Sequence, residues 1–362
     1  MGDNRLLIKN YFENHSFVKS DIESYNNFIE RELQKIIEEN QFVEPTIIPA
    51  NVDEFKIKFD KVRVTRPEIT EADGSKRRLY PMEARLRKIT YSAPVFVTVS
   101  AIINGSQRES FETKIGDIPV MIHSRQCHLY KLGREDLIKH GEDPDDSGGY
   151  FIINGTEKVI VKIEDLASNK FMIDKTPAAT SKVTGRLFSE AGAFKIPHTV
   201  EMLKDGIIYL TFARVQRVSV ITVIKALGML RDEAIMRAVS DNRQFDEVLV
   251  NLLAGADIKS QEDAIDVLAK KAGITQSKEI RVERMKDVLN KYLLPHLGIT
   301  DKDRHLKALN LCKMIKKFVL VSRSEIERDD KDHYMNKRLK LSGDLLADLF
   351  RVNLKVLIGD ML

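Results

Sequence analysis

Two acidic stretches carry residue types that could hold a metal ion. Residues 329–333 contain three aspartates and a histidine, and Mg²⁺ and Zn²⁺ are bound by such groups. One short loop, however, supplies no independent second set of ligands. Residues 141–149 are also acidic, but they lack the spacing and the terminal glutamate of an EF-hand loop. We therefore expect no metal site in either stretch, and the sequence has no P-loop or Ser/His/Asp set that would predict catalysis.

A second chemistry, the binding of anions by lysine and arginine, is suggested by residues 148–163. Asn154-Gly155 lies between two β-forming runs, and this pair best tolerates the two positive φ angles of a type I′ hairpin turn. Side chains alternate along a strand, so we expect one face after the turn to be buried and the other to carry two ammonium groups. In an isolated hairpin such lysines are usually only solvated. The two faces comprise Glu157, Val159, Val161 and Ile163, and Thr156, Lys158, Ile160 and Lys162.

The composition is that of a folded, water-soluble protein with room for two or three domains. The 362 residues are 43% hydrophobic and 31% charged, and the net charge is only +4. This charge alone does not identify a nucleic-acid-binding protein. The two cysteines, Cys127 and Cys312, form no zinc pattern and are expected to be reduced thiols. The best apolar run, residues 218–230, is short and contains Lys225, so we expect a cytoplasmic protein that does not enter a membrane.

The elements that must position these residues include both helices and strands, so we predict the α+β class. Residues 20–23 form a capping-box pattern, followed by apolar residues at helical spacing to Ile36. Residues 55–64 alternate apolar and basic side chains, which predicts a strand with one basic face, and more basic residues follow at 76–88. Residues 177–181 resemble a linker. Helical stripes then follow, the first capped by Ser260, and a last helix is capped by Ser342.

Several of these strings together resemble one known family. Residues 80–94, 115–129, 150–163 and 329–339 resemble motifs in the N-terminal part of the second-largest subunit of multisubunit DNA-dependent RNA polymerases, and they follow one another in the order found in that family. The resemblance extends over about residues 18–357. The stretch 122–149 before the hairpin is longer than in bacterial members, which favours the archaeal or eukaryotic branch. We expect an archaeal chain, of a subunit that some archaea encode as two polypeptides.

The resemblance implies an architecture and a function. It implies an N-terminal extension (1–19), a discontinuous protrusion domain (20–177 and 341–362) of mixed sheet and helix, and an inserted, helix-rich α+β lobe domain (178–340). The chain would form one wall of the DNA/RNA cleft of a nucleotidyltransferase complex during DNA-templated transcription. It would contain no catalytic residues, because the family's catalytic Mg²⁺ is held by the largest subunit. The implied partners are that subunit, the rest of the second-largest subunit, the other polymerase subunits, template DNA, nascent RNA and transcription factors.

The residues that we predict to contact nucleic-acid phosphates are Arg125, Lys158, Lys337 and Arg338. Lysine and arginine position a duplex without reading its sequence, which suits a polymerase that moves over any template. The alternative for Lys337 and Arg338 is pairing with Asp330 or Asp332. Two other functions stay open: a free-standing, non-catalytic nucleic-acid-binding module, and a scaffold held by protein partners. The apolar residues Val352, Val356 and Leu357 of the last helix favour the scaffold, because we expect them to be buried only by a partner.

Overall fold

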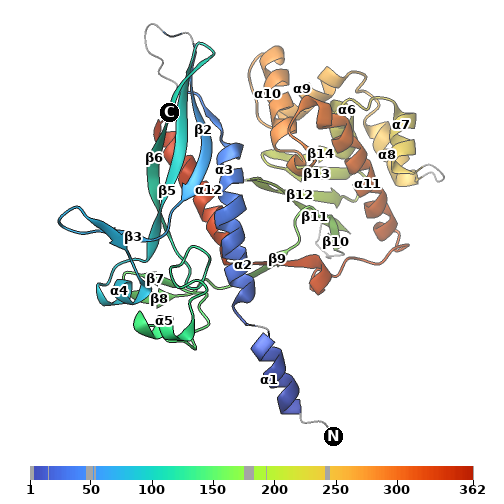
Figure 1. Ribbon diagram of the computed structural model, residues 1–362. Helices are drawn as coiled ribbons and strands as arrows, with labels where there is room; N and C mark the ends of the chain where they lie inside the picture. Colours follow the sequence, from blue (N-terminus) through green and yellow to red (C-terminus); the bar gives the residue numbers. More distant parts are fainter. Residues whose placement is uncertain are drawn as a thin grey trace. The chain divides into compact units, whose positions relative to one another are not determined.

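The computed structural model describes residues 4–14, 16–45, 52, 54–174, 183–192, 194–240 and 245–361 (Figure 1). The predicted linker at 177–181 lies outside the described residues. The fold mixes helices with several antiparallel sheets, so the predicted α+β class is confirmed. Two compact units are present: the first comprises Met1–Glu164 and Leu339–Leu362, and the second comprises Asp165–Arg338. The protrusion and lobe boundaries at 177 and 341 stay predictions.

The first unit is built on a four-stranded antiparallel sheet with the order β1-β2-β5-β6. Alternation along these strands turns Phe59, Val95 and Val97 into the core. The helix that ends the unit, α12, packs against α2 and contributes Ala347 and Leu354 to this core. The strands are β1 (Phe42–Val43), β2 (Phe55–Val64), β5 (Ser92–Ile103) and β6 (Ser106–Pro119), and the helices are α1 (Asn4–Asn14), α2 (Lys19–Asn27), the π-helix η1 (Phe28–Glu32), α3 (Leu33–Glu39) and α12 (Ser342–Met361).

The predicted apolar stripe of the first long helix is confirmed, but its capping box is wrong. Tyr25 and Ile36 are fully buried. The helix begins at Lys19 with Val18 as its N-cap residue, two residues earlier than expected, and no described side chain caps it. Ser20 therefore lies inside the first turn, where its hydroxyl accepts a hydrogen bond from the Lys162 ammonium at 3.4 Å. Ser342 likewise lies inside its helix, as the first residue of α12, and its hydroxyl donates to the Asp21 carbonyl at 3.1 Å.

A second small core in the first unit supports the hairpin of interest. Tyr91, Val120, Ile122 and Ile152 are fully buried in it. Short elements surround it: β3 (Glu68–Thr70), β4 (Lys76–Arg78), α4 (Pro81–Leu86), α5 (Arg134–Lys139), β7 (Phe151–Ile153) and β8 (Thr156–Lys158).

The second unit has a five-stranded antiparallel sheet with the order β10-β11-β12-β13-β14 and one large core with the helices. Ser260 caps α9 by accepting from the Asp263 amide at 3.1 Å, as predicted. The strands are β10 (Met172–Asp174), β11 (Thr184–Ala191), β12 (Phe194–Met202), β13 (Ile208–Phe212) and β14 (Val215–Ser219). The helices are α6 (Val220–Ala226), α7 (Asp232–Val239), α8 (Asp246–Ala254), α9 (Gln261–Lys271), α10 (Lys278–Lys291), α11 (Arg304–Ser322) and the 3₁₀ turns η2 (Pro295–Leu297), η3 (Asp301–Asp303) and η4 (Tyr334–Asn336).

The chain passes between the units through β9 (Ile163–Leu166) and β15 (Lys337–Lys340), which pair with each other. Among the described residues, no helix has the length and apolar character needed to cross a membrane. In the same residues, no group of three or more His, Cys, Asp and Glu side chains is placed to hold a metal ion.

Candidate nucleic-acid interface

The predicted hairpin is present and has the predicted turn. Asn154 and Gly155 have φ angles of 51° and 76°. Positive φ angles at both central residues are characteristic of a type I′ turn. β7 and β8 pair through three residue pairs, from Ile153 with Thr156 to Phe151 with Lys158. The tight turn thus presents Lys158 at the end of its outgoing strand.

The predicted faces beyond Lys158 are wrong. Val159 and Val161 were expected to be buried, but they are 70% and 76% exposed. Ile160, expected on the polar face, packs against the core of the first unit. The reason is that the ladder ends at Lys158, so the alternation of a strand does not continue into residues 159–162.

The loop after α4 holds the turn. The Thr90 hydroxyl lies 3.1 Å from both the backbone amide and the side-chain oxygen of Asn154, and the Gly155 amide donates to the Ile89 carbonyl at 3.1 Å. A Cβ atom at Gly155 would lie 2.7 Å from the Cα of Lys88. Lys88 therefore sits directly beside the turn, and its exposed ammonium has no hydrogen bond or ion pair within the described residues.

A second set of contacts neutralises the arginine nearest the hairpin. Arg85 on α4 bonds Glu142 and Glu157 at 2.8 Å each and the Tyr150 hydroxyl at 2.7 Å. Burial and the Asp146 carboxylate raise the pKa of Tyr150, so its phenol stays protonated and donates to Asp146. The acidic loop 141–149 thus ties the hairpin to α4, and Arg85 has no free charge for another anion.

Lys158 and Arg125 both lie in the first unit, but they differ in their partners. Lys158 is exposed, and no acidic group in the described part of the chain pairs with it. Arg125 pairs with Glu30 of η1 at 2.7 Å, and its backbone amide donates to the Asn26 side chain at 3.0 Å. Arg125 therefore holds its loop to η1, which sequence spacing did not reveal.

Lys337 and Arg338 belong to the second unit. The Arg338 guanidinium donates to the carbonyls of Lys337 at 2.7 Å and Met335 at 3.3 Å. Its charge is therefore not neutralised by an acidic group within the described residues, in contrast to the alternative pairing with Asp330 or Asp332. The Lys337 ammonium lies 6.0 Å from the centre of the Tyr334 ring.

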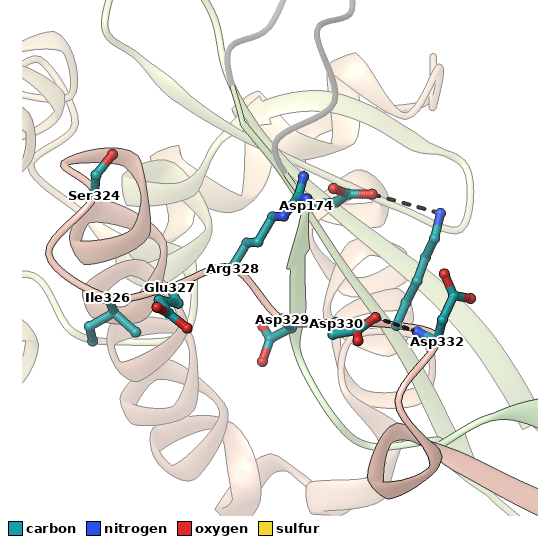
Figure 2. Close-up of a pocket in the computed structure, with 9 residues that line it drawn as sticks. Asp174, Ser324, Ile326, Glu327, Arg328, Asp329, Asp330 and Asp332 are labelled. Carbon is teal, nitrogen blue, oxygen red and sulfur yellow. Dashed lines mark hydrogen bonds and ion pairs between the residues drawn. The ribbon is translucent and has the colours of Figure 1, made fainter.

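Residues 329–332 of the acidic stretch line a pocket of about 780 Å³ (Figure 2). The carboxylate of Asp329 bonds the Lys317 ammonium at 2.6 Å and the Ile173 amide at 2.9 Å. Asp330 accepts from the Asp332 amide at 2.9 Å, and the three carboxylates point in different directions. These contacts give the carboxylates of Asp329 and Asp330 structural partners within the loop and the neighbouring elements.

Comparison with known proteins identifies the family. Residues 16–362 match the family model described as RNA polymerase beta subunit. Similar proteins include the DNA-directed RNA polymerase subunit Rpo2N of Methanocaldococcus jannaschii, 40% identical over 99% of this chain and 73% of that protein. The chain belongs to the RNA polymerase beta subunit family.

Two further relatives show how much of the family's length is present. The subunit Rpo2N of Halobacterium salinarum is 37% identical over 99% of this chain and 71% of its own length. The subunit Rpo2 of Saccharolobus solfataricus is 38% identical over 98% of this chain, which covers only 31% of that protein. The family predicted from the sequence, including its archaeal relatives, is confirmed.

The basic runs of this beta-family chain are largely neutralised. On β2, Lys58 pairs with Asp60 at 2.6 Å and Arg63 with Glu112 at 2.6 Å. In the second run, Arg87 pairs with Glu83 at 2.9 Å. Lys88, the last residue of the second run, has no partner in the described part of the chain. Its position beside the hairpin turn was not predicted, because its neighbour Gly155 is 67 residues away in the chain.

Proposed function

We propose that this chain is the N-terminal part of the second-largest subunit of an archaeal DNA-directed RNA polymerase and forms one wall of the cleft that holds DNA and RNA. The observation that carries the proposal is the family match over residues 16–362, together with relatives that are named DNA-directed RNA polymerase subunits. In this role the chain works in the cytoplasm, within a nucleotidyltransferase complex, during DNA-templated transcription.

The chain contributes positioning and no catalytic residue. The resemblance assigns the catalytic Mg²⁺ to the largest subunit, so no residue here is proposed to bind it. The partners are the largest subunit, the rest of the second-largest subunit, the other subunits, transcription factors, template DNA and nascent RNA. The outer face of α12 supports protein partners, because Val352 and Val356 are each 59% exposed on the side opposite its buried residues.

Phosphate contact is proposed for Arg125, Lys158, Lys337 and Arg338. Lys158 and Arg338 carry charges that no described acidic group neutralises, so each can pair with a phosphate without breaking an ion pair. Arg125 would have to share its guanidinium between Glu30 and a phosphate. Such scattered single charges hold a backbone without reading bases.

The test is a reconstituted polymerase carrying Lys158→Ala or Lys337→Ala/Arg338→Ala, with Lys204→Ala as the matched control. Lys204 is exposed at the turn between β12 and β13 and has no partner in the described part of the chain. We measure elongation-complex half-life over a salt series. Each removed phosphate contact should lower the slope of log affinity against log salt by about one, with little change in sequence preference.

Two outcomes are opposed. A lowered slope for the site variants and an unchanged slope for Lys204→Ala supports phosphate contact. An unchanged half-life and slope, with a lowered melting temperature, means that these residues stabilise the fold only. For Arg125, comparing Arg125→Ala with Glu30→Gln separates phosphate contact from stabilisation of the fold. Both variants break the Arg125–Glu30 ion pair, but only Glu30→Gln keeps the cation.

A further inference from the structure

The second unit contains a groove whose lining is cationic at the rim and apolar at the floor. Its volume is about 300 Å³. Residues before β10, strand β11, the turn η2 and one face of α11 form its walls. No acidic side chain is among its lining residues, which are Asn169, Lys170, Phe171, Leu187, His296, Asn310, Lys313, Met314 and Lys317.

The three lysines of the rim differ in how their charge is compensated. The Lys317 ammonium is neutralised by Asp329 at 2.6 Å. The Lys170 ammonium donates to the side-chain oxygen of Asn336, a neutral group that leaves its charge in place. Lys313 is exposed and has no partner within the described residues. The rim therefore carries two positive charges that no described acidic side chain compensates.

The floor is fixed and apolar. Leu187 and Met314 are almost fully buried, and the ring of Phe171 rests on Gly185, where a Cβ atom would lie only 2.3 Å from the ring. Burial and the charge of Lys307 lower the pKa of His296, so its imidazole adds no charge to the groove at neutral pH. The amide of Asn310, one turn before Lys313 on α11, can hydrogen-bond a carboxylate held by the lysines.

We propose that this groove binds an acidic peptide segment of a partner protein, with a large apolar side chain on the floor and carboxylates on Lys170 and Lys313. A peptide of this composition uses both the rim and the floor, whereas a phosphodiester backbone gains only from the rim charges. Phe171 packs on Gly185, so the part of its ring beside Gly185 is not available for a nucleobase to stack on. The inference does not depend on the proposed role in the nucleic-acid cleft, because its ligand is a protein.

The test measures binding of a fluorescein-labelled synthetic peptide of alternating glutamate and leucine to the full chain by fluorescence anisotropy. Lys313→Glu is the site variant and Lys313→Met removes the charge alone. Lys302→Glu in η3 is the matched control, since Lys302 is also exposed, in the same unit, and without a partner in the described part of the chain. We expect Lys313→Glu to weaken binding about tenfold or more, Lys313→Met to weaken it less, and the control to change it less than about twofold.

Two further probes test the two halves of the groove. A peptide with glutamine in place of glutamate and one with serine in place of leucine should both bind more weakly than the parent peptide. Equal binding of the parent peptide to wild type and Lys313→Glu would overturn the proposal. So would a single-stranded oligonucleotide that binds more tightly than the peptide and loses its binding in Lys313→Glu, because the groove would then be a nucleic-acid site.

Discussion

His198 should make the second unit sensitive to acid in a defined window. The side chain lies on β12 and is 1% exposed. Its Nε2 accepts the backbone amide of Leu294 at 3.1 Å, and its Nδ1 lies 3.0 Å from the Ile196 carbonyl. These partners require a neutral ring with the proton on Nδ1, because a proton on Nε2 would face the Leu294 amide. Leu294 has a φ angle of 44°, so the hydrogen bond from its amide to His198 also stabilises a backbone in the left-handed conformation.

The magnitude follows from the pKa. Burial lowers the pKa of His198 from 6.5 to about 4. The difference, 6.5 − 4, at about 1.4 kcal/mol per pH unit, corresponds to about 3 kcal/mol. The folded state binds the proton more weakly than the unfolded state. The contribution is therefore fully present above pH 6.5 and is lost as the pH falls from 6.5 to 4.

Urea unfolding followed by circular dichroism, at pH 7 and pH 4.5, tests this in wild type and His198→Phe. Circular dichroism is the suitable signal because the chain has no tryptophan. The phenyl ring keeps the contact with Phe212 but leaves the Leu294 amide without its acceptor, which should cost about 1–3 kcal/mol at pH 7.

At pH 4.5 the difference in unfolding free energy between wild type and His198→Phe should shrink or reverse, because only wild type is destabilised by protonation of a buried imidazole. Carboxylates and His296 titrate in both proteins, so the difference between the two pH profiles reports His198 together with its electrostatic interaction with His296. Parallel profiles from pH 4.5 to pH 7 would refute the reasoning.

Two other substitutions test the hairpin and the outer face of α12. Gly155→Ala should destabilise the first unit by about 1–3 kcal/mol in urea unfolding, because the new Cβ atom would lie 2.7 Å from the Lys88 Cα at a positive φ angle; wild-type stability would contradict this. Val352→Asp should change the stability of the isolated chain by less than about 0.5 kcal/mol but reduce its incorporation into a reconstituted polymerase, measured by gel filtration, whereas the exposed neighbour Asn353→Asp should do neither. Normal incorporation of Val352→Asp would exclude this face from the assembly.

The features that sequence predicted correctly depend on a few consecutive residues. Asn154-Gly155 specifies its turn because both φ angles are set by residues inside it. Ser260 caps α9 because donor and acceptor are three residues apart. The buried face of α2 follows from helical spacing alone. These local rules succeeded where the partners lie within one element, but the equally local capping box at Ser20 did not form, since its helix begins before it.

The features that sequence missed depend on partners far apart in the chain. Arg125 and Glu30 are 95 residues apart, and Arg63 and Glu112 are 49 apart, so no spacing rule joins them. The exposure of Val161 was missed for a related reason. A strand's alternation holds only while the ladder continues, and the length of β8 is set by its partner β7. Such limits are set by tertiary packing and cannot be read from one segment.

Charge pairing also argues against locating the nucleic-acid surface by the density of basic residues. The chain has 58 basic and 54 acidic residues, so most cations can find an internal partner. The dense basic strand β2 is where Lys58 and Arg63 are neutralised, whereas Lys158 has no acidic partner within the described residues, since its neighbour Glu157 pairs with Arg85. A paired cation must break its ion pair to bind a phosphate, and an unpaired one need not. In the proposed role in a polymerase that slides along its template, a few isolated charges of this kind would give contacts that are individually weak and can be exchanged at each step.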